Sequence, residues 1–135
     1  MAKNVFINLP VKELERSEKF FTQLGFTVNP QFSDDKAKCI VIGDNIFVML
    51  LTEEFFQGFT KKPISNAKKS TQVLIAIDAD SKEEVIELVK RAQQAGGTMY
   101  AEPRDYGWMY QNSFADLDGY QWEIIYMDQS KMPIE

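Results

Sequence analysis

The sequence predicts an α+β fold built from two βαβββ modules, each with one strand, one helix and three further strands. Three observations support this fold class. The spacing of hydrophobic residues changes from strand to helix and back to strand twice along the chain. A polar connection at residues 59–70 separates the two runs, so module one takes residues 1–58 and module two residues 71–135. With 135 residues and 44% hydrophobic content, the chain suffices for a single domain around a sizeable core.

Module one begins with a strand over residues 4–11 (NVFINLPV). Residues 12–26 then place Leu14, Phe21 and Leu24 at helical spacing and include a glycine suited to end the helix. Turn residues follow, which favour hairpins between short strands. Three strands are expected, at residues 26–32, 37–42 and 45–51.

Module two repeats this order. A strand over residues 71–78 (TQVLIAID) precedes a helix opened by Ser81 and Glu84, the spacing of a capping box. The helix has hydrophobic residues in the i, i+3, i+4, i+7 pattern and stops at two glycines. Three strands are again expected, at residues 98–101, 107–115 and 120–127.

The repeat has a consequence for function. A four-stranded sheet with a single helix has one face that it cannot cover by itself. Two such modules placed together are therefore expected to form a curved mixed sheet around a cleft. An ordinary α+β sandwich without a cleft is the alternative.

Charge and composition exclude several classes of partner. The net charge of -5 and the isoelectric point near 4.8 argue against nucleic acid or an anionic membrane, because phosphate binding requires clustered basic residues. No hydrophobic stretch approaches the roughly 20 residues that span a bilayer. The start of the chain has no signal-peptide pattern, so a cytoplasmic location is expected. The chain has no histidine, and Cys39 is expected to be a buried, unreactive thiol.

Two segments carry a resemblance to a known family. The first is FINLPVKELERSEKFFTQLGF, residues 6–26, and the second is DLDGYQWEIIY, residues 116–126, with its D-x-D-G-x-x-W-E pattern. Together they resemble the vicinal oxygen chelate superfamily, which includes glyoxalase I, extradiol dioxygenases, fosfomycin-resistance transferases and bleomycin-binding proteins. The resemblance runs from Val5 to about Asp128 and looks closest to small bacterial predicted lactoylglutathione lyases. It implies the glyoxalase/bleomycin resistance/dioxygenase fold.

The resemblance also implies where a divalent metal would bind. In metal-using members the ligands come from the first and last strands of each module, and the matching positions here are Phe6, Phe47, Gln72 and Glu123. Only Glu123 is an ordinary ligand for such cations, whereas Gln72 could offer an amide oxygen and the phenylalanines offer nothing. We therefore expect no cofactor and at most a weak or incomplete divalent metal site.

Alternation along the strands predicts which residues face the cleft. In the last strand Glu123 is expected there with Gln121 and Ile125, while Trp122, Ile124 and Tyr126 pack against the helices. By the same rule the cleft receives Phe6, Asn8, Pro10, Gln72, Leu74 and Ala76, and the core receives Val5, Ile7, Leu9, Val73, Ile75 and Ile77. Phe47 and Met49 either line the cleft or fill the core. Glu123 is either a ligand contact or a solvent-facing residue paired with a lysine.

Two functions are consistent with these residues. The first is a binding protein, resembling the bleomycin-binding members, that holds a small aromatic or cationic molecule in a metal-free or metal-poor cleft. Phe6, Phe47, Trp108 and Tyr110 would stack on that molecule, Glu123 would oppose its charge, and Asn8 and Gln72 would complete the contacts. The alternative is a lactoylglutathione-lyase-like or other enzyme of the superfamily, with Glu123 as catalytic base or metal ligand. Trp108 and Tyr110, beside Gly107, form either a mobile rim of the cleft or ordinary packing.

We expect the chain to work as a homodimer. In this superfamily a chain of two modules often completes its cleft by pairing its first module with the second module of a partner chain. Residues 59–70 are long and polar enough to let the modules exchange in this way. A cleft closed within a monomer is the alternative.

Overall fold

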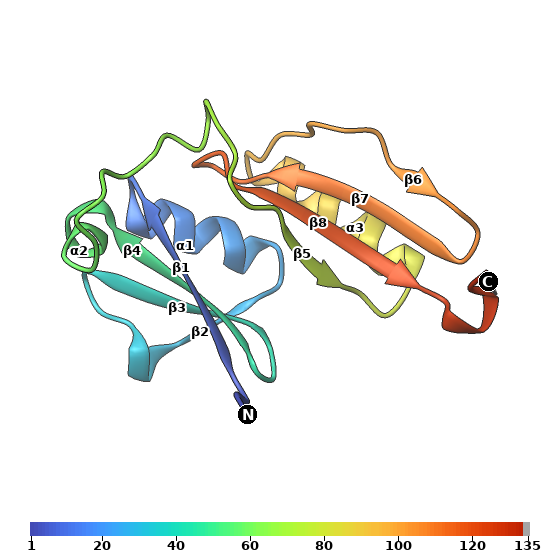
Figure 1. Ribbon diagram of the computed structural model, residues 1–135, viewed down its shortest axis with the longest axis horizontal. Helices are drawn as coiled ribbons and strands as arrows, with labels where there is room; N and C mark the ends of the chain where they lie inside the picture. The colour runs from blue at the N-terminus through green and yellow to red at the C-terminus, as the bar shows by residue number, and fades with distance from the viewer. Residues whose placement is uncertain (134–135) are drawn as a thin grey trace. The chain divides into compact units, whose positions relative to one another are not determined.

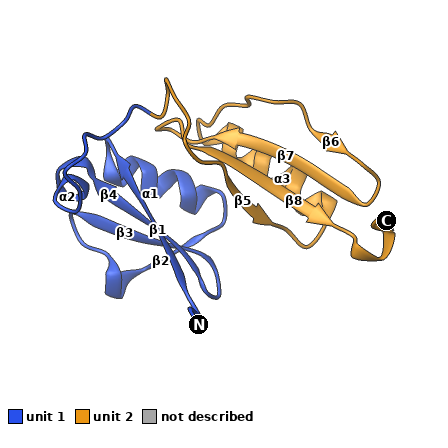
Figure 2. Ribbon diagram, viewed as in Figure 1, with its two compact units in different colours: residues 1–66 blue, residues 67–135 orange. Residues whose placement is uncertain are grey.

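The computed structural model describes residues 1–133 of the chain. Two compact units make up the chain, residues 1–66 and residues 67–135 (Figure 2). The boundary between them falls inside the polar connection expected at residues 59–70. In the described part of the chain, no helix has both the length and the apolar character needed to cross a membrane.

Unit 1 contains a four-stranded mixed sheet, one long helix and one short helix (Figure 1). Its elements are β1 (Val5–Val11), α1 (Leu14–Gln23), β2 (Thr27–Asn29), β3 (Ala37–Gly43), β4 (Ile46–Thr52) and α2 (Glu53–Gln57). The strands lie in the order β1-β4-β3-β2, with β1 parallel to β4 and the other pairs antiparallel. Sequence periodicity predicted these elements except α2. The strand β2 is shorter than predicted because Pro30 begins a turn of 3-10 helix.

The core of unit 1 lies between α1 and the sheet. Phe20, Phe21 and Leu24, at the end of the helix, are buried, and Ile40 and Val48 of the sheet are fully buried. The glycine after the helix has a φ of 106°, a conformation that residues with a side chain rarely adopt. Gly25 therefore ends the helix α1, as the sequence predicts.

One end of β1 departs from the predicted core. Leu9 is buried and Ile7 is half-buried, as alternation predicted, but Val5 is exposed. Val5 is the first residue of an edge strand and is flanked by a neighbouring strand on one side only. The prediction that Val5 belongs to the core is therefore wrong.

Unit 2 repeats the architecture of unit 1. Its elements are β5 (Ile75–Asp78), α3 (Lys82–Gln94), β6 (Arg104–Asp105), β7 (Met109–Ala115) and β8 (Gln121–Met127). The strands lie in the order β5-β8-β7-β6, again with the first strand parallel to the last and the other pairs antiparallel. Neither sheet closes on itself. The predicted α+β fold with an internal repeat is confirmed.

The helix α3 begins and packs as its sequence predicts. The Ser81 hydroxyl accepts a hydrogen bond of 3.0 Å from the backbone N–H of Glu84, as in a capping box. The Glu84 carboxylate accepts its 3.0 Å bond from the N–H of Asp80 instead of Ser81. The i, i+3, i+4, i+7 pattern places Val85, Leu88, Val89 and Ala92 on one face, and all are buried except Leu88, which is half-buried. The fully buried side chains of Trp122 and Ile124 confirm the predicted core face of β8.

Two predicted strands of module two are shorter or displaced. The strand β5 starts at Ile75, so residues 71–74 lie outside the sheet and Val73 is 61% exposed rather than buried. Of the strand predicted at residues 98–101, only Thr98 forms a β-bridge, and the outer strand β6 occurs instead at Arg104–Asp105. Both strands lie at an edge of the sheet, where a single neighbour determines how far pairing extends.

Gly119, in the turn between β7 and β8, lies unusually close to another part of unit 2. Its φ is 95°, and a Cβ atom added to it would lie 2.9 Å from the backbone nitrogen of Lys68 and 3.0 Å from its Cα. We expect Gly119→Ala to lower the free energy of unfolding by roughly 3 kcal/mol, combining an unfavourable φ with overpacking. Chemical denaturation measures this loss.

Gly107→Ala is the matched control for this prediction. Gly107 has a similar positive φ of 81°, but an added Cβ would meet nothing within 4 Å. Gly107→Ala should lower the free energy of unfolding only through its unfavourable φ, by about 1–2 kcal/mol. Equal losses for the two variants would contradict the close packing of Lys68 against Gly119.

Candidate functional site

Glu123 lies on the face of the unit 2 sheet that α3 does not cover. In β8 it is paired with Ala76 of β5 and with Ser113 of β7. Its neighbours Trp122 and Ile124 point to the opposite face and are buried. We call the face that carries Glu123 the open face of unit 2. The predicted direction of the Glu123 side chain agrees with this placement.

Tyr100 reaches the same face from the connection between α3 and β6. Two backbone hydrogen bonds join Thr98 to Ala115, at 3.0 and 2.7 Å, and this pairing brings Tyr100 beside Ser113. The phenol oxygen donates a long hydrogen bond of 3.5 Å to the carbonyl of Trp122. Tyr100, Ser113 and Glu123 therefore form a row across β7 and β8, which we call the polar row.

The electrostatics of Tyr100 reflect its position in this row. Burial raises the pKa of Tyr100, and a hydrogen bond with Ser113 lowers it. The negative charge of Glu123 and a hydrogen bond to its carboxylate raise this pKa further. The phenol therefore stays protonated near neutral pH, and its single O–H proton is shared between two acceptors, the Trp122 carbonyl and the Glu123 carboxylate. Sequence reasoning missed Tyr100, because its place depends on the bridge between Thr98 and Ala115.

Glu123 has no basic partner in the part of the chain that the structure describes. It is half-buried, and within residues 1–133 no lysine or arginine forms an ion pair with it. Other acids of unit 2 do have such partners, since Asp105 pairs with Lys82 at 3.0 Å and Glu87 with Arg91 at 3.2 Å. The alternative in which Glu123 pairs with a lysine is therefore not observed within residues 1–133.

Tyr110 lies on the other face of the sheet, away from the polar row. It alternates with Gln111 and Met109 along β7, and the Lys82 ammonium of α3 lies 4.9 Å from the centre of its ring. Trp108 precedes β7 and is half-buried, and its carbonyl accepts a hydrogen bond from the backbone of Asp128 at 2.6 Å. The structure does not bring Tyr110 together with Glu123.

Gln72 does not occupy a strand position. It is exposed and precedes β5, so alternation along that strand does not fix its direction. Its neighbour Thr71 donates a hydrogen bond of 3.0 Å to the side chain of Gln121 on β8. Gln72 as a ligand contact stays a prediction.

The predicted aromatic residues of unit 1 lie together. Phe6 of β1 and Phe47 of β4 are cross-strand neighbours whose rings are stacked, with centroids 5.0 Å apart and planes 15° from parallel. Phe6 is half exposed and Asn8, two residues further along, is exposed. Cys39 is fully buried, and burial raises the pKa of its thiol, as expected for an unreactive cysteine.

The fold agrees with a comparison of the sequence with known families. Residues 4–124 match a family described as the Glyoxalase/Bleomycin resistance protein/Dioxygenase superfamily. The chain belongs to this superfamily. The match covers both units and ends just after Glu123.

Several solved structures share this fold. A hypothetical protein from S. aureus is 32% identical with a TM-score of 0.78, and the match covers 93% of this chain and 95% of that one. A glyoxalase/bleomycin resistance protein/dioxygenase family enzyme from Burkholderia phytofirmans PsJN is 20% identical with a TM-score of 0.77, over 93% and 99% of the chains. A fosfomycin resistance protein from Mesorhizobium loti is 18% identical with a TM-score of 0.68, over 93% of each chain. No match was found among curated proteins.

The donor set of this superfamily member does not fit a metal centre of the kind that the resemblance implies. At the four matching positions only Glu123 carries a carboxylate, while Phe6 and Phe47 carry no donor atom. Residues 1–133 contain no group of three or more His, Cys, Asp or Glu side chains arranged to hold a metal ion. The role of Glu123 therefore depends on its own carboxylate and on the side chains beside it.

Proposed function

We propose that this superfamily member binds a small cationic molecule with an aromatic part, and that Glu123 on the open face of unit 2 is its charge partner. The observation that carries the proposal is the half-buried Glu123 carboxylate, which lacks a basic partner among residues 1–133 and lies beside Tyr100. A partly desolvated charge without a counter-charge costs free energy. A bound ammonium or amidinium group offsets that cost.

The surroundings of Glu123 favour a ligand that is both charged and planar. Tyr100 supplies an aromatic surface next to the carboxylate, and an aromatic ring attracts cations. Ala76 and Ile125, on the same face, supply apolar contacts. A site with apolar walls and one charged group is typical of small-molecule binding.

The exposed aromatic pair of unit 1 supports the aromatic part of the proposal. Phe6 and Phe47 present stacked rings at the surface of their own sheet, with Asn8 beside them. A planar molecule gains dispersion and hydrophobic contact on such a surface. The lyase-like alternative, with Glu123 as base or metal ligand, has no comparable support in the donor set.

Glu123→Gln is expected to weaken binding of a cationic probe while leaving the fold nearly intact. The probes are benzamidine, benzamide and benzoate, which share a ring and differ in charge. Benzamidine should raise the melting temperature of the wild type most. The variant should bind benzamidine about 10- to 100-fold more weakly, the effect of losing one charge-assisted hydrogen bond, and should lose no more than about 1 kcal/mol of stability.

Glu102→Gln is the matched control, because Glu102 is an exposed acid of the same unit and lies outside the polar row. It should bind benzamidine as the wild type does. The proposal fails if the two variants weaken benzamidine binding equally, or if benzamide and benzoate raise the melting temperature of the wild type as much as benzamidine does. A loss of several kcal/mol in Glu123→Gln without a change in binding would make Glu123 a structural residue.

We also propose that the working form is a homodimer made by module pairing. The exposed hydrophobic side chains of the two units support it, and they include Phe6 in unit 1 and Val73, Leu74 and Met127 in unit 2. Burying exposed apolar side chains against a partner chain is favourable. Sedimentation velocity at low micromolar concentration should find a species of twice the 15.6 kDa chain mass. A single species at the monomer mass would end the dimer proposal.

A further inference from the structure

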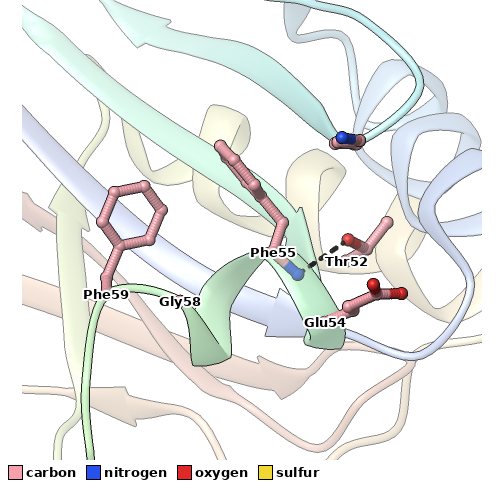
Figure 3. A pocket seen from close by; sticks show the side chains of 6 residues that line it. Thr52, Glu54, Phe55, Gly58 and Phe59 are labelled. Carbon is pink, nitrogen blue, oxygen red and sulfur yellow. Dashed lines mark hydrogen bonds between the residues drawn. The ribbon is translucent and has the colours of Figure 1, made fainter.

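A cavity of about 310 Å³ opens in unit 1 where β4 ends and α2 begins (Figure 3). Its size is at the lower end of the range for small-molecule sites. The residues that line it are Lys36, Thr52, Glu54, Phe55, Gly58 and Phe59. None of them belongs to the polar row, which lies in unit 2.

Two phenylalanine rings form one wall of this cavity. Phe55 and Phe59 meet edge to face, with centroids 5.1 Å apart and planes at 85°. They rise from α2 and from the turn that follows it (Figure 3). Phe55 is 37% exposed and Phe59 is 72% exposed, so much of their apolar surface remains in contact with water.

The exposed ring of Phe59 is held on an ordered turn. The side chain of Gln57 donates hydrogen bonds to the carbonyls of Thr60 at 3.0 Å and of Lys62 at 2.8 Å. The backbone N–H of Phe59 donates to the carbonyl of Phe56 at 3.0 Å. The ordered turn fixes the backbone that carries the ring, so less conformational freedom is lost when the ring contacts a ligand, which favours binding.

The cavity also presents one charge of each sign. Lys36 and Glu54 both line it, and within residues 1–133 neither forms an ion pair. The hydroxyl of Thr52 accepts a hydrogen bond from the N–H of Phe55 at 3.2 Å and keeps its own proton to donate. Besides its aromatic wall, the cavity is thus lined by residues that carry an ammonium, a carboxylate and a hydroxyl donor.

We propose that this cavity binds a zwitterionic aromatic molecule of the amino-acid type. The ring of the ligand packs on Phe55 and Phe59. Its carboxylate pairs with the Lys36 ammonium and its ammonium group pairs with the Glu54 carboxylate. A ligand with only one charge would leave either Lys36 or Glu54 without its proposed partner.

The test is an amide NMR titration of the full chain with L-phenylalanine, phenylacetate and phenethylamine. These probes share a ring and carry both charges, only the negative charge and only the positive charge. L-phenylalanine should bind most tightly and shift the amide signals of Thr52, Phe55 and Gly58. Equal affinity for the three probes, no shift with L-phenylalanine, or shifts confined to unit 2 would overturn the proposal.

Phe59→Ala should weaken L-phenylalanine binding about three- to tenfold, the usual effect of one aromatic contact. Phe32→Ala is the matched control, because Phe32 is 58% exposed in the same unit and does not line the cavity. The control should leave the affinity unchanged, and an equal loss in both variants would overturn the proposal.

Two charge variants test the ligand class independently of the aromatic wall. Lys36→Gln should reduce the preference of the cavity for L-phenylalanine over phenethylamine, because phenethylamine lacks the carboxylate that pairs with Lys36. Glu54→Gln should reduce the preference for L-phenylalanine over phenylacetate, because phenylacetate lacks the ammonium group that pairs with Glu54. Both residues are at the surface, so the fold should be retained. Unchanged preferences in both variants would show that the charges do not select the ligand and would overturn the zwitterion assignment.

Discussion

Replacing Trp122 with alanine is expected to lower the free energy of unfolding by about 3–5 kcal/mol. The indole ring is fully buried and stacks on Phe114, with centroids 6.2 Å apart and planes 5° from parallel. Its Nε1 also donates a hydrogen bond of 3.1 Å to the buried carboxyl group of Asp116. The substitution therefore leaves a large cavity in the core of unit 2 and removes a donor from a buried acid.

Trp108→Ala is the comparison that makes this result interpretable. Trp108 is half-buried before the start of β7, so its loss should cost roughly 1–2 kcal/mol. Urea denaturation of the two variants measures both losses. If Trp108→Ala were as destabilising as Trp122→Ala, the packing around Trp122 would not be the main hydrophobic contribution to unit 2.

Much of the fold follows from patterns that are local in the sequence. The helix α1 is specified by hydrophobic residues at helical spacing and by Gly25, which adopts a positive φ at the helix end. The alternation around Glu123 assigns Trp122 to the core and Glu123 to the open face, because successive residues of a strand point to opposite faces. Each of these conclusions needs only neighbours in the chain.

The errors arise where pairing with a distant segment decides the outcome. The first strand of module two was expected from residue 71, but pairing begins at Ile75 opposite Trp122, which leaves Val73 exposed. Tyr110 was expected to face the ligand together with Glu123. It is four residues from Phe114 on the same strand and therefore points to the same face, and Phe114 pairs with Trp122 on the face that α3 covers. Alternation within β7 was sufficient to place Tyr110, provided that the register with β8 was known.

The missed residues have the same physical origin. Tyr100 reaches Ser113 only because Thr98 bridges to Ala115, and no local pattern encodes that offset. The short helix α2 had a usable signal, since Thr52 precedes two glutamates and its hydroxyl accepts from the N–H of Phe55. Recognising Thr52 as a helix N-cap would have predicted that β4 ends at Thr52 and that Phe55 lies on a helix.

The turn between β7 and β8 contains a buried acid whose role the turn pattern alone did not reveal. The Asp116 carboxyl group accepts hydrogen bonds from the backbone N–H groups of Asp118 and Tyr120, both at 3.0 Å, and from the indole of Trp122 at 3.1 Å. Burial raises the pKa of Asp116 to about 7, and the hydrogen bonds from Trp122, Tyr120 and Asp118 oppose that effect without outweighing it. Asp116 therefore titrates in the folded protein far above the ordinary value of 3.8.

This raised pKa predicts that the contribution of Asp116 to stability falls as the pH rises. Between the unfolded pKa near 3.8 and the folded pKa of about 7, the native state keeps a proton that the unfolded state has lost. The contribution is complete below about pH 4 and decreases through pH 7 by on the order of 4 kcal/mol, since one pKa unit corresponds to about 1.4 kcal/mol.

The measurement is the difference in free energy of unfolding between the wild type and Asp116→Asn from pH 4 to pH 8. All other titrating groups are common to both proteins, so Asp34, Asp105 and Asp128, whose pKa values are lowered, cancel in the difference. The amide of the variant keeps an oxygen for the backbone donors but turns an NH₂ group toward Trp122, so the variant starts from lower stability. The advantage of the wild type should shrink as the pH approaches 7. An advantage that grows with pH would mean that the three N–H donors stabilise the carboxylate more than burial penalises it, and the direction of the pKa shift would be reversed.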